Sequence, residues 1–333
     1  MPGLNLLVRV DATHEIGLAH AVRSGRLVSN LSTKPEVTVA GHDTALLRPY
    51  FGRAHYTSID EFVRAGSRPD AYLVDCQVLD LNFCSKRADG TAIPVIVVDD
   101  YGGQMAADLV INGTVLDDYH RYSGLSDGAQ LFCGADYALI DPVFANTPWQ
   151  GPGEEKTLTI VAGGGNRAAD WVHELVDDAP ELKTLGSINL VVGQAFPEFE
   201  KLTSRTEGSS IKLFKGISAT DMAALLSSSS VALVTGGMIV YEALAVGVPT
   251  IVFPQEMNLV KEAEWFAQKN CICNLGYEGG MQMTLVSKMI RLLGDSPDMA
   301  LAYSKNARTT IDGRGMERAA VVIDDYLLRT RRA

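Results

Sequence analysis

Short apolar runs alternate with segments of helical periodicity along the whole chain. Uniformly apolar runs of this length are typical of parallel strands that helices cover on both faces. We therefore expect buried strands at 4–10, 36–41, 71–75, 93–100, 109–112, 158–162, 188–192, 211–214, 231–234 and 249–253. The helical pattern is clearest at 21–31, 168–176, 220–226, 239–245, 259–269 and 315–331.

One stretch interrupts this alternation. Residues 146–156 combine proline, glycine and charge without any period, and the strand pattern restarts after them. A chain of 333 residues also suits two domains better than one. The predicted fold class is α/β, with two doubly wound, Rossmann-like domains at 1–146 and 157–333 that face each other across a cleft. Residues 147–156 are expected to be the linker and hinge.

Composition narrows the class of protein. With 47% hydrophobic residues the chain can bury a core, and a net charge of −11 disfavours binding to nucleic acid. Five cysteines are too few and too irregular for a disulfide framework, and no zinc-site spacing completes the pair at 271 and 273. The apolar segment 231–253 is broken by glycine and proline, so we expect no stable membrane insertion. These features predict a cytoplasmic protein.

The first strand, turn and helix carry the strongest candidate chemistry. The apolar run ends at Asp11, a loop with Gly17 follows, and His20 stands at the start of a helix, where backbone N–H groups favour anions. A histidine there can exchange a proton near neutral pH beside a bound phosphate or sugar. The alternative is that His20 only caps the helix.

Polar residues also end the other strands of the N-terminal half. In a parallel sheet, ligands bind at the carboxyl ends of the strands. Taken singly, however, each of these residues is more typical of a cap or a turn. They are Asp75, Asp99, Asp100 and Asn112.

Two glycine loops suggest a nucleotide in the C-terminal half, although no Walker A motif is present. Residues 163–168 fit the dinucleotide pattern G-x-G-x-x-A, but no acid ends the next strand to hold a ribose. Gly236 and Gly237 precede a helix that carries Glu242. Its carboxylate could accept both ribose hydroxyls while the loop amides hold a diphosphate. Tight packing of the first loop, and a dipole role for Glu242, are the alternatives.

A resemblance to a known family rests on motifs spread over nearly the whole chain. The opening reads Arg9-x-Asp11 and Ile16-Gly-x-x-His20-x-x-Arg23. Further matches are Asp99-Asp100, Asn112, Cys133-Gly-Ala-Asp-Tyr-Ala-Leu139, Gly163-Gly164, Gly236-Gly237, Glu242-Ala-Leu244, Gly247-Val-Pro249, Asn258 and Asp312-Gly-x-Gly-x-x-Arg318. In these motifs the chain resembles the UDP-sugar hydrolases of the pseudaminic acid pathway, relatives of the GT-B glycosyltransferases.

The resemblance implies a function. It implies a hydrolase that cleaves a UDP-linked deoxyamino sugar at the anomeric carbon to UDP and free sugar, in nonulosonic (pseudaminic-type) acid or surface-glycan biosynthesis, without a metal or cofactor. His20 takes the position of the catalytic base, Glu242 that of the ribose ligand and Ile217 that of the residue at the uracil. The implied substrate-binding set is Asp11, Gly17, Ala19, Gly163, Gly164, Ile217, Gly236, Gly237, Met238, Glu242 and Asn258.

Four positions depart from the family pattern around the sugar and phosphate pocket. Ala19 stands for a glycine, Gln77 for a tyrosine, Asp141 for an arginine and Leu259 for a glutamine. These departures leave open which sugar UDP carries and whether the sugar is hydrolysed. The alternatives are a GT-B glycosyltransferase, in which His20 deprotonates an acceptor hydroxyl, and a non-catalytic protein that binds a nucleotide-sugar. The stereochemical course and the oligomeric state also stay open.

Overall fold

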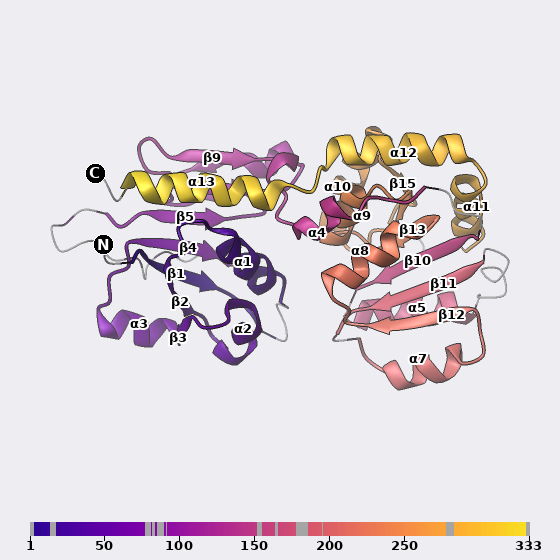
Figure 1. Cartoon of the computed structure of the whole chain (residues 1–333), viewed down its shortest axis with the longest axis horizontal. Coiled ribbons are helices and arrows are strands. Elements are labelled where there is room, and N and C mark those ends of the chain that lie inside the picture. The colour runs from indigo at the N-terminus through magenta and orange to yellow at the C-terminus, as the bar shows by residue number, and fades with distance from the viewer. Residues whose placement is uncertain are drawn as a thin grey trace. The chain divides into compact units, whose positions relative to one another are not determined.

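The computed structural model divides the chain into two compact units, one of Met1–Leu139 with Arg314–Ala333 and one of Ile140–Gly313. It describes residues 3–13, 18–76, 81, 84, 90, 92–151, 155–163, 166–177, 186–194, 196–277 and 283–330. Figure 1 labels the helices and strands of both units. None of the helices described is both long and apolar enough to cross a membrane.

The first unit is built on a parallel sheet of seven strands in the order β3-β2-β1-β4-β5-β7-β9. These strands are β1 (Asn5–Val10), β2 (Glu36–Ala40), β3 (His55–Thr57), β4 (Ala71–Asp75), β5 (Val95–Val98), β7 (Leu109–Asn112) and β9 (Gln130–Cys133). Strand β1 pairs with β2 on one side and β4 on the other, so the order reverses beside it. In such sheets, ligands bind outside the strand ends at this reversal. A short two-stranded sheet joins β6 (Gly103–Gln104) and β8 (Tyr122–Ser123).

Helices cover both faces of this sheet because successive side chains of a strand point to opposite sides. Leu6 and Val8 of β1 belong to one buried cluster, and Leu7 belongs to another with Phe62 of α3. The helical segments of the unit are α1 (Ala19–Asn30), α2 (Thr44–Phe51), α3 (Ile59–Ala65), α13 (Gly315–Thr330) and the short 3₁₀ turns Asp117–His120 and Ala135–Tyr137.

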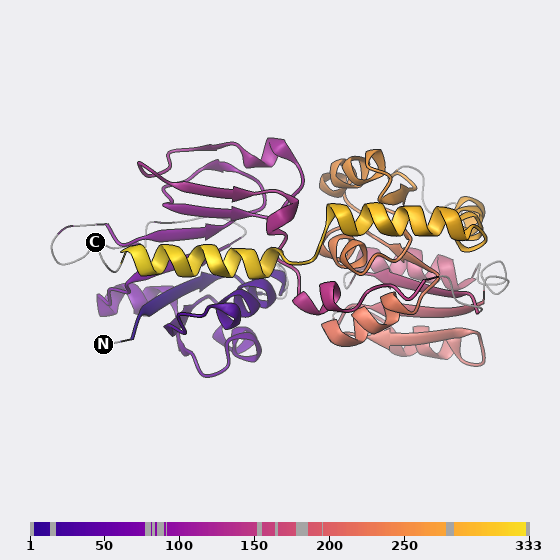
Figure 2. The same cartoon turned by 45° about the horizontal axis from the view of Figure 1, so that its top comes forward.

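The last helix, α13, belongs to the first unit, whereas the sequence pattern placed it in the second. Figures 1 and 2 show it lying along the strands and helices formed by the beginning of the chain. Its apolar face joins the same buried cluster as β1, and Asp324 accepts hydrogen bonds from the backbone N–H groups of Ser32 (2.6 Å) and Thr33 (3.1 Å). The helix therefore completes a core that residues before it leave open.

The second unit repeats the same plan with six parallel strands in the order β12-β11-β10-β13-β14-β15. They are β10 (Thr157–Ala162), β11 (Ser187–Val192), β12 (Ile211–Lys215), β13 (Val231–Val234), β14 (Thr250–Val252) and β15 (Ile272–Asn274). Its helices are α4 (Pro142–Asn146), α5 (Asn166–Asp177), α7 (Phe199–Thr206), α8 (Ala219–Ser227), α9 (Met238–Val246), α10 (Met257–Gln268), α11 (Met283–Gly294) and α12 (Pro297–Thr310). Here the reversal lies between β10 and β13. Two doubly wound α/β units are thus confirmed.

The stretch expected to link the domains lies in the second unit. The chain passes between the units at 139–140 and again at 313–314, not within 147–156. The backbone N–H of Trp149 donates to Val246 (2.8 Å), that of Gln150 donates to Ser227 (3.0 Å), and the Trp149 indole donates to the Ser229 carbonyl (2.7 Å). Residues 147–151 form neither helix nor strand, and these donors are satisfied by α8, α9 and the chain after α8.

Candidate functional site

The point where the strand order reverses in the first unit holds a cluster of charged side chains. His20 is the second residue of α1, the helix that follows β1, and Asp75 is the last residue of β4, the strand beside β1. Their side chains meet, with 2.6 Å between His20 Nδ1 and Asp75 Oδ1. The sheet therefore joins two residues that lie 55 positions apart in the chain.

Arg23 and Ser24, one turn further along α1, complete the cluster. Arg23 donates to both Asp75 oxygens, from Nε to Oδ2 (2.9 Å) and from Nη2 to Oδ1 (2.6 Å). Its remaining nitrogen, Nη1, donates to Asp100 Oδ1 (2.7 Å), and the Ser24 hydroxyl donates to Asp75 Oδ2 (2.6 Å). Each Asp75 oxygen thus accepts from two groups, so the carboxylate has little freedom to turn.

Asp75 is fully buried yet stays ionised. Burial alone would raise the pKa of its carboxyl, but the charge and hydrogen bonds of Arg23, together with the His20 contact, lower that pKa to about 2. The Arg23 guanidinium is also taken out of water, but Asp75 and Asp100 hold its pKa above the ordinary value. The buried charges are therefore paired, as buried charges must be.

This geometry determines which nitrogen of His20 can act as a base. An ionised carboxylate can only accept, so a contact of 2.6 Å requires the hydrogen of the neutral ring to be on Nδ1. The lone pair is then on Nε2, and the side chain is 14% exposed. The interpretation of His20 as a helix cap is wrong: the cap position is Leu18, and the ring bonds to Asp75 instead.

Asp11 directly follows β1 at the same edge of the sheet. The Asp11 side chain is buried, and its Oδ1 lies 2.5 Å from Arg9 Nη1. The two groups form an ion pair, but the angles at Oδ1 are not those of a hydrogen bond. Arg9 also approaches His42 Nε2 (3.4 Å), and the Cys76 thiol donates to the Arg9 carbonyl (3.7 Å). Burial raises the pKa of Cys76 to about 12, so this thiol is neutral. Ala19 is exposed at the first position of α1, and Gly17 lies outside the described residues.

Two other strand-end residues have a structural role. The Asp99 carboxylate accepts from the backbone N–H of Gly102 (2.6 Å) and the hydroxyl of Tyr122 (2.9 Å). Asn112 donates to the Tyr122 oxygen (2.8 Å) and the Tyr119 carbonyl (3.0 Å). Burial raises the pKa of Tyr122. These bonds fix the loops after β5 and β7, as expected of turn-forming residues.

At the corresponding edge of the second unit, glycine backbone takes the place that charged side chains have in the first. Gly236 and Gly237 follow β13 with φ of +105° and +75°, a region that side chains rarely adopt. Gly237 is the cap of α9, no side chain bonds the cap, and Met238 is 37% exposed as the first helical residue. A Cβ on Gly236 would lie 3.0 Å from Leu259 of α10. The amino ends of two helices thus approach one glycine loop, which favours an anion.

The other residues of this unit that the sequence predicts to bind the substrate lie on several different elements. Glu242 is half-buried in α9, and Ile217 is half-buried between β12 and α8. Gly163 is exposed at the end of β10, with no atom within 4 Å of where a Cβ would be. Asn258 is a residue of α10, and Gly164 lies outside the described residues. Gly163 and Gly236–Gly237 therefore follow the two strands at the reversal.

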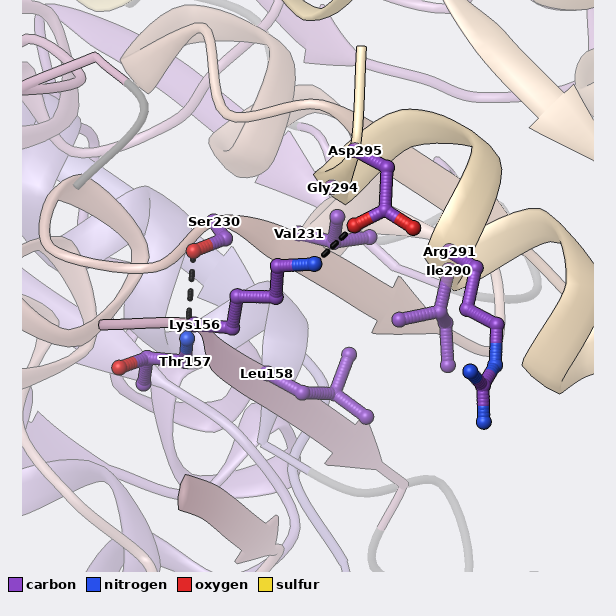
Figure 3. Close-up of a pocket in the computed structure, with 9 residues that line it drawn as sticks. All are labelled: Lys156, Thr157, Leu158, Ser230, Val231, Ile290, Arg291, Gly294 and Asp295. Carbon is purple, nitrogen blue, oxygen red and sulfur yellow. Dashed lines mark hydrogen bonds and ion pairs between the residues drawn. The ribbon is translucent and has the colours of Figure 1, made fainter. Parts of the chain in front are cut away.

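A small pocket lies at the opposite, amino edge of this sheet. Residues at the start of β10, at the start of β13 and at the end of α11 line it, and Lys156 forms an ion pair with Asp295 there (Figure 3). Its volume of about 40 Å³ holds only a few water molecules. The pocket is thus too small for a nucleotide, and it lies away from the strand ends where such ligands bind.

Sequence reasoning selected His20 but missed its partners. In the sequence, Asp75 is only the acidic end of a strand, and Arg23 is only part of a motif. The available signal was the acid at the end of a buried strand, whose pairing with β1 the sequence did not show. Among the described residues, no group of three or more His, Cys, Asp or Glu side chains could hold a metal ion.

Comparison with known proteins supports the architecture. No protein-family model matches the chain. The spore coat polysaccharide biosynthesis protein SpsG of Bacillus subtilis (strain 168) is 26% identical over 338 residues, which cover 95% of this chain and 96% of SpsG. MurG of Acinetobacter baumannii superposes with a TM-score of 0.65 at 12% identity, over 97% of this chain and 99% of that one.

A UDP-GlcNAc 2-epimerase from Neisseria meningitidis, solved with UDP-GlcNAc bound, gives a TM-score of 0.58 at 13% identity, over 98% of this chain and all (100%) of that one. At these identities the solved structures establish the fold. The strand order of both units and the full-length superpositions show that this chain has the GT-B fold.

Proposed function

We propose that this protein is a UDP-sugar hydrolase that releases UDP and the free sugar. The observation that carries the proposal is the His20–Asp75 contact at the reversal of the first sheet. It gives a histidine whose Nδ1–H is held by a buried carboxylate and whose Nε2 is left as the proton acceptor. That arrangement is the one a general base needs.

In the proposed reaction, a water oxygen attacks the anomeric carbon while its proton passes to His20 Nε2. The bond between the anomeric carbon and the oxygen of the β-phosphate breaks, and UDP leaves with the bonding electron pair. Asp75 stabilises the imidazolium that forms, because it remains ionised at neutral pH. Asp11, Gly17 and Ala19 are proposed to contact the sugar.

The nucleotide is proposed to bind at the edge of the second sheet. Backbone N–H groups at Gly164, Gly236 and Gly237 and the amino end of α9 hold the diphosphate, because they offer donors without a basic side chain. Glu242 accepts the ribose hydroxyls and Ile217 contacts the uracil. Gly163, Met238 and Asn258 complete the contacts.

The similar proteins support this substrate class. SpsG is named for polysaccharide biosynthesis, and the Neisseria epimerase was solved with UDP-GlcNAc. We place the chain among proteins that act on UDP-sugars in polysaccharide biosynthesis, and propose a deoxyamino sugar of the pseudaminic type as its particular substrate.

Glycosyl transfer is the second candidate, and one observation favours it. Tyr101, next to Asp100, is 57% exposed and its ring packs edge-on against Tyr119 (centroids 5.7 Å apart). Exposed aromatic rings give an acceptor sugar a surface on which to stack. In this case His20 would take the proton of an acceptor hydroxyl in place of water.

The test is product analysis with purified protein and a panel of UDP-sugars, with and without glycan acceptors. Hydrolysis predicts equimolar UDP and free sugar without an acceptor. Release of UDP only with an acceptor would establish transfer, and UDP-sugar binding with neither product would contradict both enzymatic proposals. His20→Asn should slow the release by about 10²–10⁴-fold, whereas His55→Asn, at an exposed histidine of β3, should leave its rate unchanged.

A further inference from the structure

Arg23 touches both members of the His20–Asp75 pair. Its Nη2 lies 2.6 Å from Asp75 Oδ1 and 3.2 Å from His20 Nδ1. The Nδ1 hydrogen is used by Asp75, so the guanidinium does not donate to the ring and instead places a positive charge beside it. Asp100 holds the far end of the guanidinium at 2.7 Å, and the side chain is 12% exposed.

We propose that Arg23 is a positioning residue that keeps His20 in its neutral, proton-accepting form by offsetting the charge of Asp75. The catalytic meaning of this assignment rests on the proposed function, but the effect on the charge of His20 does not.

The reason is electrostatic. A fully buried carboxylate at 2.6 Å strongly favours the imidazolium, which cannot accept a proton. A positive charge fixed on the same carboxylate opposes that effect. Asp75 can then orient the ring without keeping it protonated. An arginine suits this task because its planar fork binds both carboxylate oxygens and still has a nitrogen for Asp100.

Among the described residues, the two charged groups at the end of β1 offset each other. Arg9 and Asp11, at the end of β1, form their own ion pair. The Cys76 thiol after β4 is neutral at physiological pH, because burial raises its pKa to about 12. Among the described residues, Asp99 after β5 bonds to Gly102 and Tyr122, away from this cluster. The described charged groups that contact His20 or its partners are Asp75 of β4, Asp100 after β5 and Arg23 of α1, so the charge balance at His20 is argued from these three.

The decisive experiment follows the imidazole of His20 by NMR as a function of pH in the full chain. Asp75→Asn should move the midpoint of its titration down, and Arg23→Gln should move it up, each by about one pH unit. The exposed His55 should titrate unchanged in every variant and serves as the internal control. A midpoint that stays in place or falls in Arg23→Gln would overturn the proposal.

Two further variants cover the case in which Arg23→Gln does not fold. Arg23→Lys keeps the charge but loses the fork, so the midpoint should stay within a few tenths of a unit while kcat falls. Asp100→Asn removes a negative charge at the half-exposed end of the network, so the midpoint should fall by less than in Asp75→Asn. An upward shift in Asp100→Asn would also contradict the proposal.

The same variants separate this inference from the proposed function. In an active enzyme, the acid limb of the kcat/KM profile should move in the direction of the NMR midpoint. If the His20 midpoint falls in Asp75→Asn and rises in Arg23→Gln but wild type turns over no UDP-sugar, the inference stands and the proposed function is contradicted. If wild type turns over UDP-sugars but the His20 midpoint does not shift in Arg23→Gln, the proposed function stands and the inference about Arg23 is contradicted.

Discussion

The two units share the order of six strands, and the first has one more at its edge, but different groups lie where the order reverses. In the first, the reversal beside β1 holds polar and charged side chains that bond to one another, with His20, Arg23 and Asp75 in mutual contact. In the second, the reversal beside β10 is lined by glycine backbone and the amino end of α9. The shared topology decides where a site forms, and the loop residues decide what it does.

The difference follows from what each task requires. A proton acceptor needs a side chain in one orientation and one tautomer, which demands fixed partners. An anion needs donors that come close, which demands glycine at positive φ and a helix end without a side-chain cap. We therefore propose that the chemistry takes place on the first unit and that the nucleotide binds to the second. Four substitutions test this difference.

The largest effect is expected at His20. His20→Asn keeps the size of the side chain but removes the base, so kcat should fall by about 10²–10⁴-fold. UDP affinity should hardly change, because the proposed nucleotide contacts lie in the other unit. Steady-state kinetics and calorimetry measure the two quantities. Turnover near the wild-type rate would remove His20 from the mechanism.

Glu242 tests the second unit in the same way. If its carboxylate accepts the ribose hydroxyls, Glu242→Ala should weaken UDP binding by about 1.5–3 kcal/mol, the range for hydrogen bonds to a charged group. Calorimetric titration with UDP measures the loss, and Glu264→Ala on α10 is a matched control on another helix of the unit. Unchanged affinity would leave Glu242 with a role in the helix dipole only.

The glycine loops should differ from each other in stability. Gly237→Ala forces a side chain into φ +75° and should lower the free energy of unfolding by about 1–3 kcal/mol. Gly163→Ala is the control, since its φ lies outside the left-handed region and no atom lies within 4 Å of the added Cβ. Urea unfolding compares them. Equal losses would show that the backbone at Gly237 is not strained by a side chain.

The smallest effect is expected in how the free energy of unfolding depends on pH through Asp75. The pKa of Asp75 is lowered to about 2 in the folded state, so its contribution to stability is complete above the unfolded value near 3.8 and is lost as pH falls through 2. Between pH 6 and pH 3 this amounts to about 1 kcal/mol. The unfolding free energy of Asp75→Asn should therefore fall less steeply with acid than that of wild type. Parallel curves would contradict the lowered pKa.

Much of the fold was predictable because its strands are buried on both faces and read as uninterrupted apolar runs. The predicted bounds of β4, β7 and β13 agree with the structure. The pattern missed β3 and β9, which lie at the edges of their sheet, where half-exposed strands mix polar and apolar residues. Edge strands bury one side only, so their runs lack the uniform signal.

The local elements can be predicted from the amino-acid sequence, because apolar periodicity, glycine loops and helix starts are encoded within a few neighbouring residues. It also marked His20, Gly236 and Gly237 as unusual. That α13 completes the first unit, and that Asp75 and Arg23 hold His20, follows from the three-dimensional packing alone. Both depend on which strands pair and which helix covers them. His20 and Asp75 are 55 positions apart in the chain, and Ser32 and Asp324 are 292 positions apart. Such pairings are set by the burial of whole faces, which no local pattern records.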